Sequence, residues 1–173
     1  NPVMKNSVIT VNDALKSRYL SDISKVRAGR NGLNKKISWV HIFEIRDVIK
    51  ESIDSYGMIL TTGIGFTDKT VAIDFVKALI EKHASALCIE TALYYNEIDE
   101  EIIRLADDND FVLIEIPVIS RFIDISKGIN TMILSAESKI YDKADKYDSK
   151  MSELETEGTL ADGIKYTAQY LNV

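Results

Sequence analysis

Residues 58–117 decide the fold and have the sequence MILTTGIGFTDKTVAIDFVKALIEKHASALCIETALYYNEIDEEIIRLADDNDFVLIEIP. Short apolar runs alternate here with longer segments in which apolar residues recur at helical spacing. The apolar runs cover 58–60, 86–89 and 111–116, and the helical segments cover 68–83 and 96–107. Strand, helix, strand, helix, strand with short connections predicts a parallel sheet with right-handed crossovers. We therefore expect an α/β fold: a small, mostly parallel sheet with flanking helices.

The residues before this stretch predict smaller elements. A short helix is expected over 11–20, with Asn12 or Asp13 as its N-cap. A strand over 26–28, a Gly/Asn turn over 29–32 and a second strand over 37–43 follow. In the main stretch, Asp68 is the expected N-cap of the first helix and Asn96 that of the second.

A long C-terminal helix is predicted over residues 121–157, which contain no proline and a single glycine. Its apolar residues repeat every seven positions, with further ones four residues on, a spacing typical of a coiled-coil seam. The seam residues are Ile133, Ile140, Ala144, Tyr147, Met151 and Leu154. One interpretation is a surface helix that packs on its own domain. The other is a helix that projects to a dimer partner or a following domain, which a length of about 50 Å favours.

The expected organisation is a domain over residues 7–120, the connecting helix over 121–157 and the start of a further domain over 158–173. The last segment has apolar residues at helical spacing, so we expect a following domain to continue beyond Val173. Met4 is a candidate for the natural start of the protein.

Charge, hydropathy and cysteine count limit the classes of function that the chain can have. The net charge is −6 and the pI is near 5.0, whereas a domain that binds phosphate backbones usually carries a basic patch. We therefore expect no direct contact with DNA. No apolar run approaches a membrane span of about 18 residues, and the N-terminus lacks the apolar stretch of a signal peptide. A single cysteine favours a reducing, cytoplasmic location.

The glycine-rich turn after residue 62 fits neither nucleotide motif. Gly63, Lys69 and Thr70 have P-loop spacing, and Gly63 and Gly65 fit a dinucleotide fingerprint. Asp68 replaces a required glycine in both motifs, and its carboxylate would repel phosphate oxygens. The turn is then either a strand-to-helix connection or a ligand site at the carboxyl edge of the sheet.

Other candidate chemistry is limited. His41 and Glu44 lie on opposite faces of an ideal strand, so they can pair only across a bend after Phe43; the alternative is a strand-end histidine bonded to backbone. Two histidines and one cysteine show no metal-ligand spacing, and Cys88 lies inside an apolar strand. We expect no enzyme activity, no metal and no cofactor.

Several short blocks of the chain, in register over about residues 9–125, resemble the N-terminal domain of PucR-type (purine catabolism regulator) transcription factors. The blocks are Thr10-Val11 leading into Leu15, Ala28-Gly29, Gly32-Leu33, Trp39-Val40-His41 with Glu44, Leu60-Thr61-Thr62-Gly63, Ala106-Asp107, Leu113-Ile114, Ile116-Pro117 and Phe122. The chain departs from the family at Tyr56-Gly57-Met58, where members often have a small or acidic residue before the strand.

The resemblance implies a sensor domain that precedes a long helix, a middle domain and a C-terminal helix-turn-helix that binds DNA. It implies a small-molecule effector, and the family name points to purine breakdown products. The positions that the resemblance assigns to a pocket are His41, Glu44, Thr61, Thr62 and Gly63, to which we add Gly65 of the same turn. We expect a homodimer that contacts DNA only through the C-terminal region and does not contact a membrane.

Two other functions stay open. The chain could be a ligand-free dimerisation or protein-docking module of the same regulator. It could also be a small enzyme with phosphate chemistry at the Gly63 turn, which would require nucleotide turnover that depends on Lys69.

Overall fold

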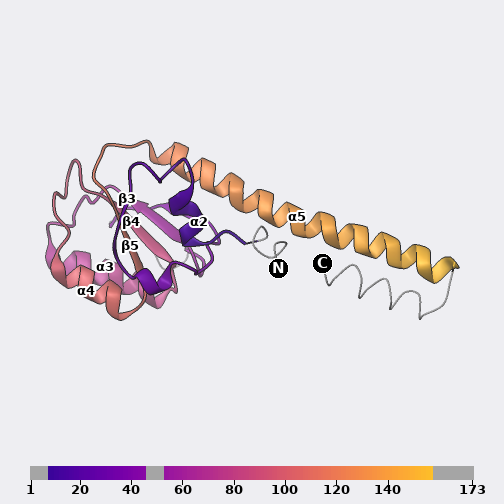
Figure 1. Cartoon of the computed structure of the whole chain (residues 1–173). Helices are drawn as coiled ribbons and strands as arrows, with labels where there is room; N and C mark the ends of the chain where they lie inside the picture. The colour runs from indigo at the N-terminus through magenta and orange to yellow at the C-terminus, as the bar shows by residue number, and fades with distance from the viewer. Residues whose placement is uncertain (1–7, 46–52, 158–173) are drawn as a thin grey trace. The chain divides into compact units, whose positions relative to one another are not determined.

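Five strands form one sheet in the order β1-β5-β4-β3-β2, of which Figure 1 labels β3, β4 and β5. Their bounds are Lys25–Ala28 for β1, Val40–Ile42 for β2, Met58–Thr61 for β3, Ala86–Glu90 for β4 and Val112–Ile116 for β5. The computed structural model describes residues 8–45 and 53–157. Strands β2 to β5 run parallel to one another, whereas β1 pairs antiparallel with β5. The predicted mostly parallel α/β sheet is confirmed.

One face of the sheet packs against helices α3 (Lys69–Glu81) and α4 (Glu100–Asp108). Ile59, Leu87 and Leu113 from the three central strands meet the apolar stripe of α3 in this core. Because strand side chains alternate between faces, their neighbours point to the opposite side.

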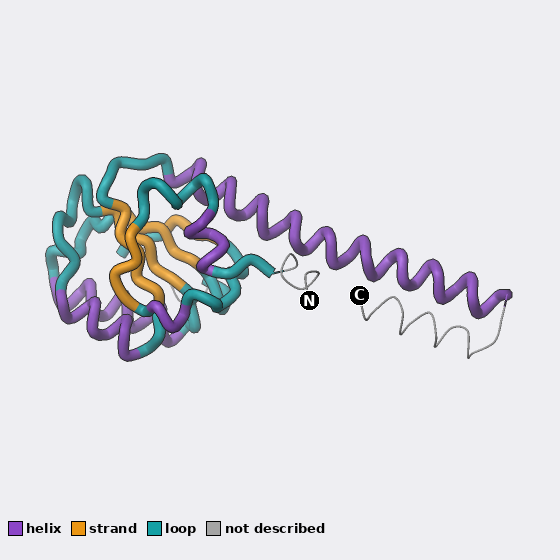
Figure 2. Tube along the Cα trace, in the orientation of Figure 1, coloured by secondary structure: helices purple, strands orange, loops and turns teal. Residues whose placement is uncertain are grey.

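The second face packs against helix α2 (Val11–Lys16) and the first turns of helix α5 (Phe122–Glu157). Leu60, Cys88 and Ile114 contribute to this core from the strands, and Ile125 and Ile129 contribute from α5. Helices therefore cover both faces of the sheet. In Figure 2 the orange strands lie between purple helices.

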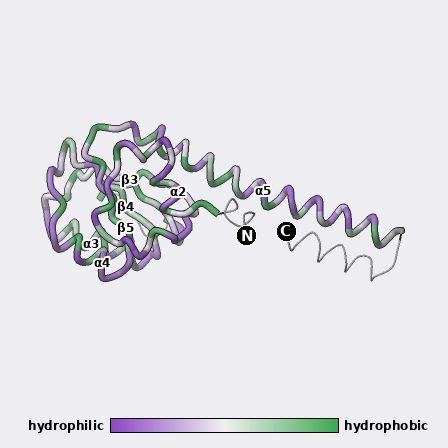
Figure 3. The backbone as a smooth tube through the Cα atoms, viewed as in Figure 1, coloured by the Kyte–Doolittle hydropathy of each residue, from purple (hydrophilic) through white to green (hydrophobic). Residues whose placement is uncertain are grey.

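Helix α5 confirms the predicted long helix, with 36 residues. The chain divides into two compact units: Ile9–Ile133 is one, and the described residues 134–157 belong to the other. The first twelve residues of α5 thus belong to the unit that contains the sheet. Figure 3 shows hydrophobic and hydrophilic residues alternating along the helix. No helix within the described ranges is apolar over a length that could cross a bilayer.

The first helix differs from the prediction at both ends. It stops at Lys16 rather than at residue 20, because the chain turns after Ser17, whose backbone is extended. Its N-cap is Thr10, not Asn12 or Asp13. The Thr10 hydroxyl accepts from the Asp13 N–H at 3.1 Å, and the Asp13 carboxylate accepts from the Thr10 N–H at 3.0 Å. This capping box satisfies two backbone donors at once.

Two further boundaries were predicted wrongly. Asp99, not Asn96, caps α4, since its carboxylate accepts from the Glu101 N–H at 2.8 Å. Strand β2 is also shorter than 37–43, because the Ile37 N–H donates to the Ile9 carbonyl and not to β3. The predicted cap of α3 is confirmed: the Asp68 carboxylate accepts from the Val71 N–H at 3.2 Å. The predicted 29–32 turn includes a 3-10 helix, Arg30–Gly32.

Candidate functional site

The turn that follows β3 lies at the carboxyl edge of the parallel strands. Thr61 is the last, fully buried residue of β3, and Gly63 and Gly65 after it have φ angles of 79° and 86°. A Cβ on Gly63 would lie 2.9 Å from the Cβ of Tyr95 and 3.1 Å from the Glu90 carbonyl oxygen. Positive φ and this close approach both require glycine, so the turn keeps its backbone tight against β4.

Glu44 joins the ends of β2 and β3. The Phe43 N–H donates to the Leu60 carbonyl at 3.0 Å, which continues the pairing past β2 and places Glu44 beside the turn. Its Oε1 accepts from the Thr62 N–H at 3.0 Å, and its Oε2 accepts from the hydroxyls of Thr61 at 3.1 Å and Thr62 at 2.9 Å. Three hydrogen bonds therefore hold a half-buried carboxylate at the sheet edge.

His41 lies on β2 but outside this network. Its Nε2 atom is buried and has no hydrogen-bond partner in the described part of the chain, so the Nε2 of His41 does not pair with Glu44. Burial lowers the pKa of His41 below its ordinary 6.5, although the charge of Asp54 raises it in part. The ring also lies close to Gly57, where a Cβ would be 3.2 Å from its Cδ2. The departure at residues 56–58 is therefore next to His41, at the start of β3.

The predicted site residues thus fall into two groups. Glu44, Thr61 and Thr62 form one hydrogen-bonded cluster, with Gly63 and Gly65 in the turn that follows. His41 is three residues before Glu44, its Nε2 does not bond the cluster, and its ring meets the ring of Phe43 edge-on at 6.4 Å between centroids.

Sequence reasoning missed two glutamates at the same edge. Glu90 ends β4 and is almost fully buried; its Oε2 accepts from the N–H of Ser120 at 3.2 Å and from its hydroxyl at 3.4 Å. Glu115 on β5 accepts from the Thr91 hydroxyl and pairs with Arg27. A glutamate at the end of an otherwise apolar strand was the available sequence signal.

The Glu115 carboxylate is held in its charged form. Burial alone raises the pKa of Glu115, but the hydrogen bond from Thr91 and the bond and charge of Arg27 outweigh it, so the pKa lies below its ordinary 4.5. The ion pair ties the antiparallel edge strand β1 to β5.

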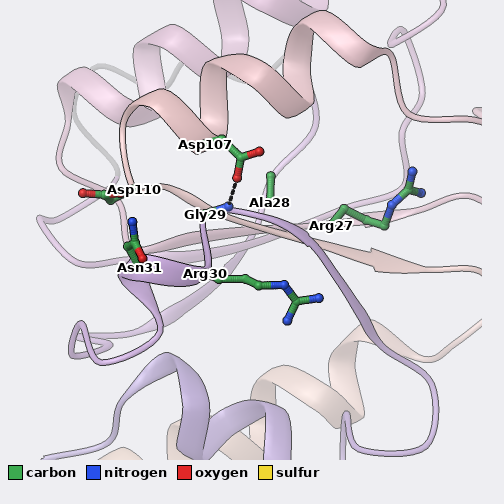
Figure 4. Close-up of a pocket in the computed structure, with 7 residues that line it drawn as sticks. All are labelled: Arg27, Ala28, Gly29, Arg30, Asn31, Asp107 and Asp110. Carbon is green, nitrogen blue, oxygen red and sulfur yellow. Dashed lines mark hydrogen bonds between the residues drawn. The ribbon is translucent and has the colours of Figure 1, made fainter.

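A cavity of about 300 Å³ lies at the opposite, amino edge of the parallel strands. Figure 4 shows its lining: Arg27, Ala28, Gly29, Arg30, Asn31, Asp107 and Asp110. The Gly29 N–H donates to Asp107 Oδ1 at 2.7 Å, and a Cβ on Gly29 would lie 1.9 Å from the Phe111 carbonyl oxygen. The lining contains none of the predicted site residues.

The reactive side chains singled out in the sequence, Cys88 and Lys69, are held in packing and ion pairs. Cys88 is fully buried, which raises the pKa of its thiol to about 12, so no thiolate nucleophile forms at neutral pH. Lys69 Nζ lies 2.7 Å from Glu101 and 3.8 Å from Asp99, across from α3 to α4. Within residues 8–45 and 53–157, no group of three or more His, Cys, Asp or Glu side chains could hold a metal ion.

The residues of the predicted seam on α5 differ in how far they are buried. Ile133 is buried in the core of the sheet-containing unit. Among residues 134–157, Ile140 is 46% exposed. Ala144 is exposed as well, whereas Tyr147, Met151 and Leu154 are half-buried.

Comparison with known proteins gives one family. The model of the purine catabolism regulatory protein-like family matches residues 13–133, more than half of the chain; the match ends where the sheet-containing unit ends. A search of curated proteins found no significant match.

A solved structure also matches: the CBS and DRTGG domains of the regulatory region of Clostridium perfringens pyrophosphatase, complexed with its activator diadenosine tetraphosphate. Its sequence identity to this chain is 19% and its TM-score is 0.48, over 77% of this chain and 49% of that one. The match spans about half the length of the chain in that structure.

Proposed function

The chain belongs to the purine catabolism regulatory protein-like family, and from this premise we propose that it contains the sensor domain of a transcription regulator. The domain binds a small metabolite and passes the signal through α5 to a DNA-binding region outside this chain. Since a bacterial-type regulator acts on DNA in the cytoplasm, we propose a cytoplasmic location. We assign this chain no enzyme activity and no cofactor.

The Glu44 cluster is the observation that carries this proposal. Open α/β sheets bind ligands outside the carboxyl ends of their strands, and here that edge presents one carboxylate, two hydroxyls and the Thr62 N–H in mutual contact. A ligand can replace these bonds if it offers N–H donors to the Glu44 carboxylate and an acceptor to the Thr62 N–H, so that no polar group is left unsatisfied. The cluster therefore suits a polar ligand that carries both N–H donors and carbonyl acceptors, a property that purine breakdown products share.

A second function is favoured by a different observation. Ile140 on α5 is 46% exposed, Tyr147 and Leu154 follow it at heptad spacing, and an apolar stripe of this kind suits a dimer contact or a docked partner. In this alternative the domain binds no metabolite and serves only dimerisation or docking. The two functions differ in whether changes at the Glu44 cluster affect any ligand response.

Thermal unfolding of the 173-residue chain with purines, ureides, nucleotides and amino acids tests the proposal. A ligand at 100 times its Kd adds about 2.7 kcal/mol to the free energy of unfolding. At about 2–4 °C per kcal/mol, the midpoint rises by roughly 5–11 °C. We expect one chemical class to produce this shift.

Variants assign the shift to a site. Glu44→Gln and Thr62→Val should abolish it, whereas Asn31→Ala in the other cavity should leave it intact. A flat response across the panel, or a shift lost only in Asn31→Ala, contradicts the proposed site. A flat response together with self-association that depends on Ile140 favours the dimerisation module.

A further inference from the structure

Strand β2 lies at the edge of the sheet, so among residues 8–45 and 53–157 no strand pairs with one side of its backbone. The pairing with β3 uses the Trp39 carbonyl, which accepts from the Met58 N–H at 2.9 Å, and the Phe43 N–H, which donates to Leu60. In a strand, alternate residues direct their peptide groups to opposite sides. The N–H and C=O of Val40 therefore point away from β3, towards the open edge.

Asn130 of α5 occupies that edge position. Its Oδ1 accepts from the Val40 N–H at 2.8 Å, and its Nδ2 donates to the Val40 carbonyl at 3.1 Å. Asn130 is 8% exposed and Val40 is 2% exposed. The side-chain amide thus replaces the peptide group of a missing strand, and it satisfies a buried donor and a buried acceptor together. Neither aspartate nor leucine offers both groups.

This pair of hydrogen bonds, which we call the Asn130 clamp, fixes the helix against the strand. Ile129 and Ile133 beside it are buried in the core between α5 and the sheet, so apolar packing sets the rotation of the helix. Apolar contacts are non-directional, whereas two hydrogen bonds to one peptide group also set the position of the helix along β2.

The other end of β2 leads to the Glu44 cluster. Val40 is four residues before Glu44; β2 pairs with β3 from Val40 to Ile42, and the Phe43 N–H continues the pairing by donating to the Leu60 carbonyl. Glu44 in turn accepts from the Thr62 N–H. Covalent chain and hydrogen bonds therefore connect Thr62 to Asn130 without a gap.

We propose that the Asn130 clamp is the link through which the state of the Glu44 cluster sets the position of α5. The inference rests on the proposed function and deepens it, because it names the residue that would carry the signal from the effector site to the helix. Coupling of this kind is reciprocal: a change at Asn130 must affect the cluster, and a change in the cluster must affect Asn130.

Amide hydrogen exchange of the 173-residue chain, followed by NMR, tests both directions without a ligand. Asn130→Leu should speed exchange of the Val40 N–H about tenfold or more, as expected when buried hydrogen bonds are lost. It should also speed exchange of the Thr62 N–H. Thr131→Ala is the matched control, since the exposed Thr131 hydroxyl donates to the Lys127 carbonyl of its own helix. Amides of β4 and β5 report any general loosening.

In the reverse direction, Glu44→Gln should shift the side-chain amide signals of Asn130 and speed their exchange. If Asn130→Leu does not fold, the Glu44→Gln measurement alone tests the coupling. The proposal is overturned if Asn130→Leu affects Val40 alone, or if Glu44→Gln leaves the Asn130 amide unchanged; the clamp would then only cover a sheet edge. Since no ligand is added, a failure here differs from failure of the thermal-shift screen.

Discussion

At the scale of the residue, single polar side chains hold separate elements of this domain together. Glu44 bonds the turn after β3, Glu90 bonds Ser120 before α5, and Asn130 bonds β2. Glu90 and Asn130 are buried and Glu44 is half-buried, and a polar group removed from water requires a partner. Their partners are distant in sequence, so each such contact depends on the complete fold.

Gly128 in α5 should respond to alanine with the opposite sign from an ordinary helix glycine. Alanine usually stabilises a helix interior by about 1 kcal/mol relative to glycine. Here a Cβ would lie 2.2 Å from the ring of Tyr19, so Gly128→Ala should lower the free energy of unfolding by about 1–3 kcal/mol.

Urea unfolding checks the sign through a double-mutant cycle. In a Tyr19→Ala background the ring is absent, and Gly128→Ala should stabilise the protein instead. If alanine stabilises the protein equally in both backgrounds, the contact between Tyr19 and Gly128 does not limit the helix.

His41 should make stability depend on pH. Burial lowers the pKa of His41 in the folded protein, so below its ordinary pKa of 6.5 the unfolded chain binds a proton more readily than the folded one. The free energy of unfolding should therefore fall as the pH drops from about 6.5 to the lowered folded pKa.

Urea unfolding between pH 7 and pH 5.5 measures this slope. His41→Leu should flatten it; His83→Asn is the control substitution, at an exposed position where asparagine tolerates the positive φ of 59°. An unchanged slope in His41→Leu would show that another group titrates.

At the scale of the element, the local sequence predicts that a helix or strand exists better than it predicts where that element begins and ends. The periodicity of residues 68–83 and the Asp68 cap predict α3 correctly, because both signals act within one helical turn. Strand β2 is different. Its apolar run begins at residue 37, but the Ile37 N–H bonds Ile9, and only tertiary pairing reveals where the strand starts. The antiparallel direction of β1 is likewise set by its pairing with β5.

Helix α5 should support self-association through its later turns. If Ile140, 46% exposed, lies in a dimer seam, Ile140→Asp should bury a charge there and convert the protein to a monomer. Sedimentation velocity gives the molecular mass. Ser138→Asp, an exposed polar position on the same helix, should leave the mass unchanged. If the unmodified chain is itself a monomer, the predicted self-association through α5 is wrong.

At the scale of the whole molecule, the sequence predicts the sheet but only part of the candidate site. The α/β class follows from residues 58–117, and the family resemblance supplies Glu44, Thr61 and Thr62, which do meet. Glu90 and Asn130 were missed because their partners, Ser120 and Val40, are 30 and 90 residues away. The cavity lined by Gly29 and Asp107 was missed for the same reason.

Hydrogen–deuterium exchange of the 173-residue chain, with and without the panel compound that raises the unfolding midpoint most, tests the central claim most directly. The account predicts slower exchange in two places, residues 61–65 at the carboxyl edge and residues 122–133 of α5, with the second effect lost in Asn130→Leu. Slower exchange confined to residues 27–31 would place the ligand in the other cavity. Slower exchange at 61–65 with α5 unchanged would contradict transmission to the helix.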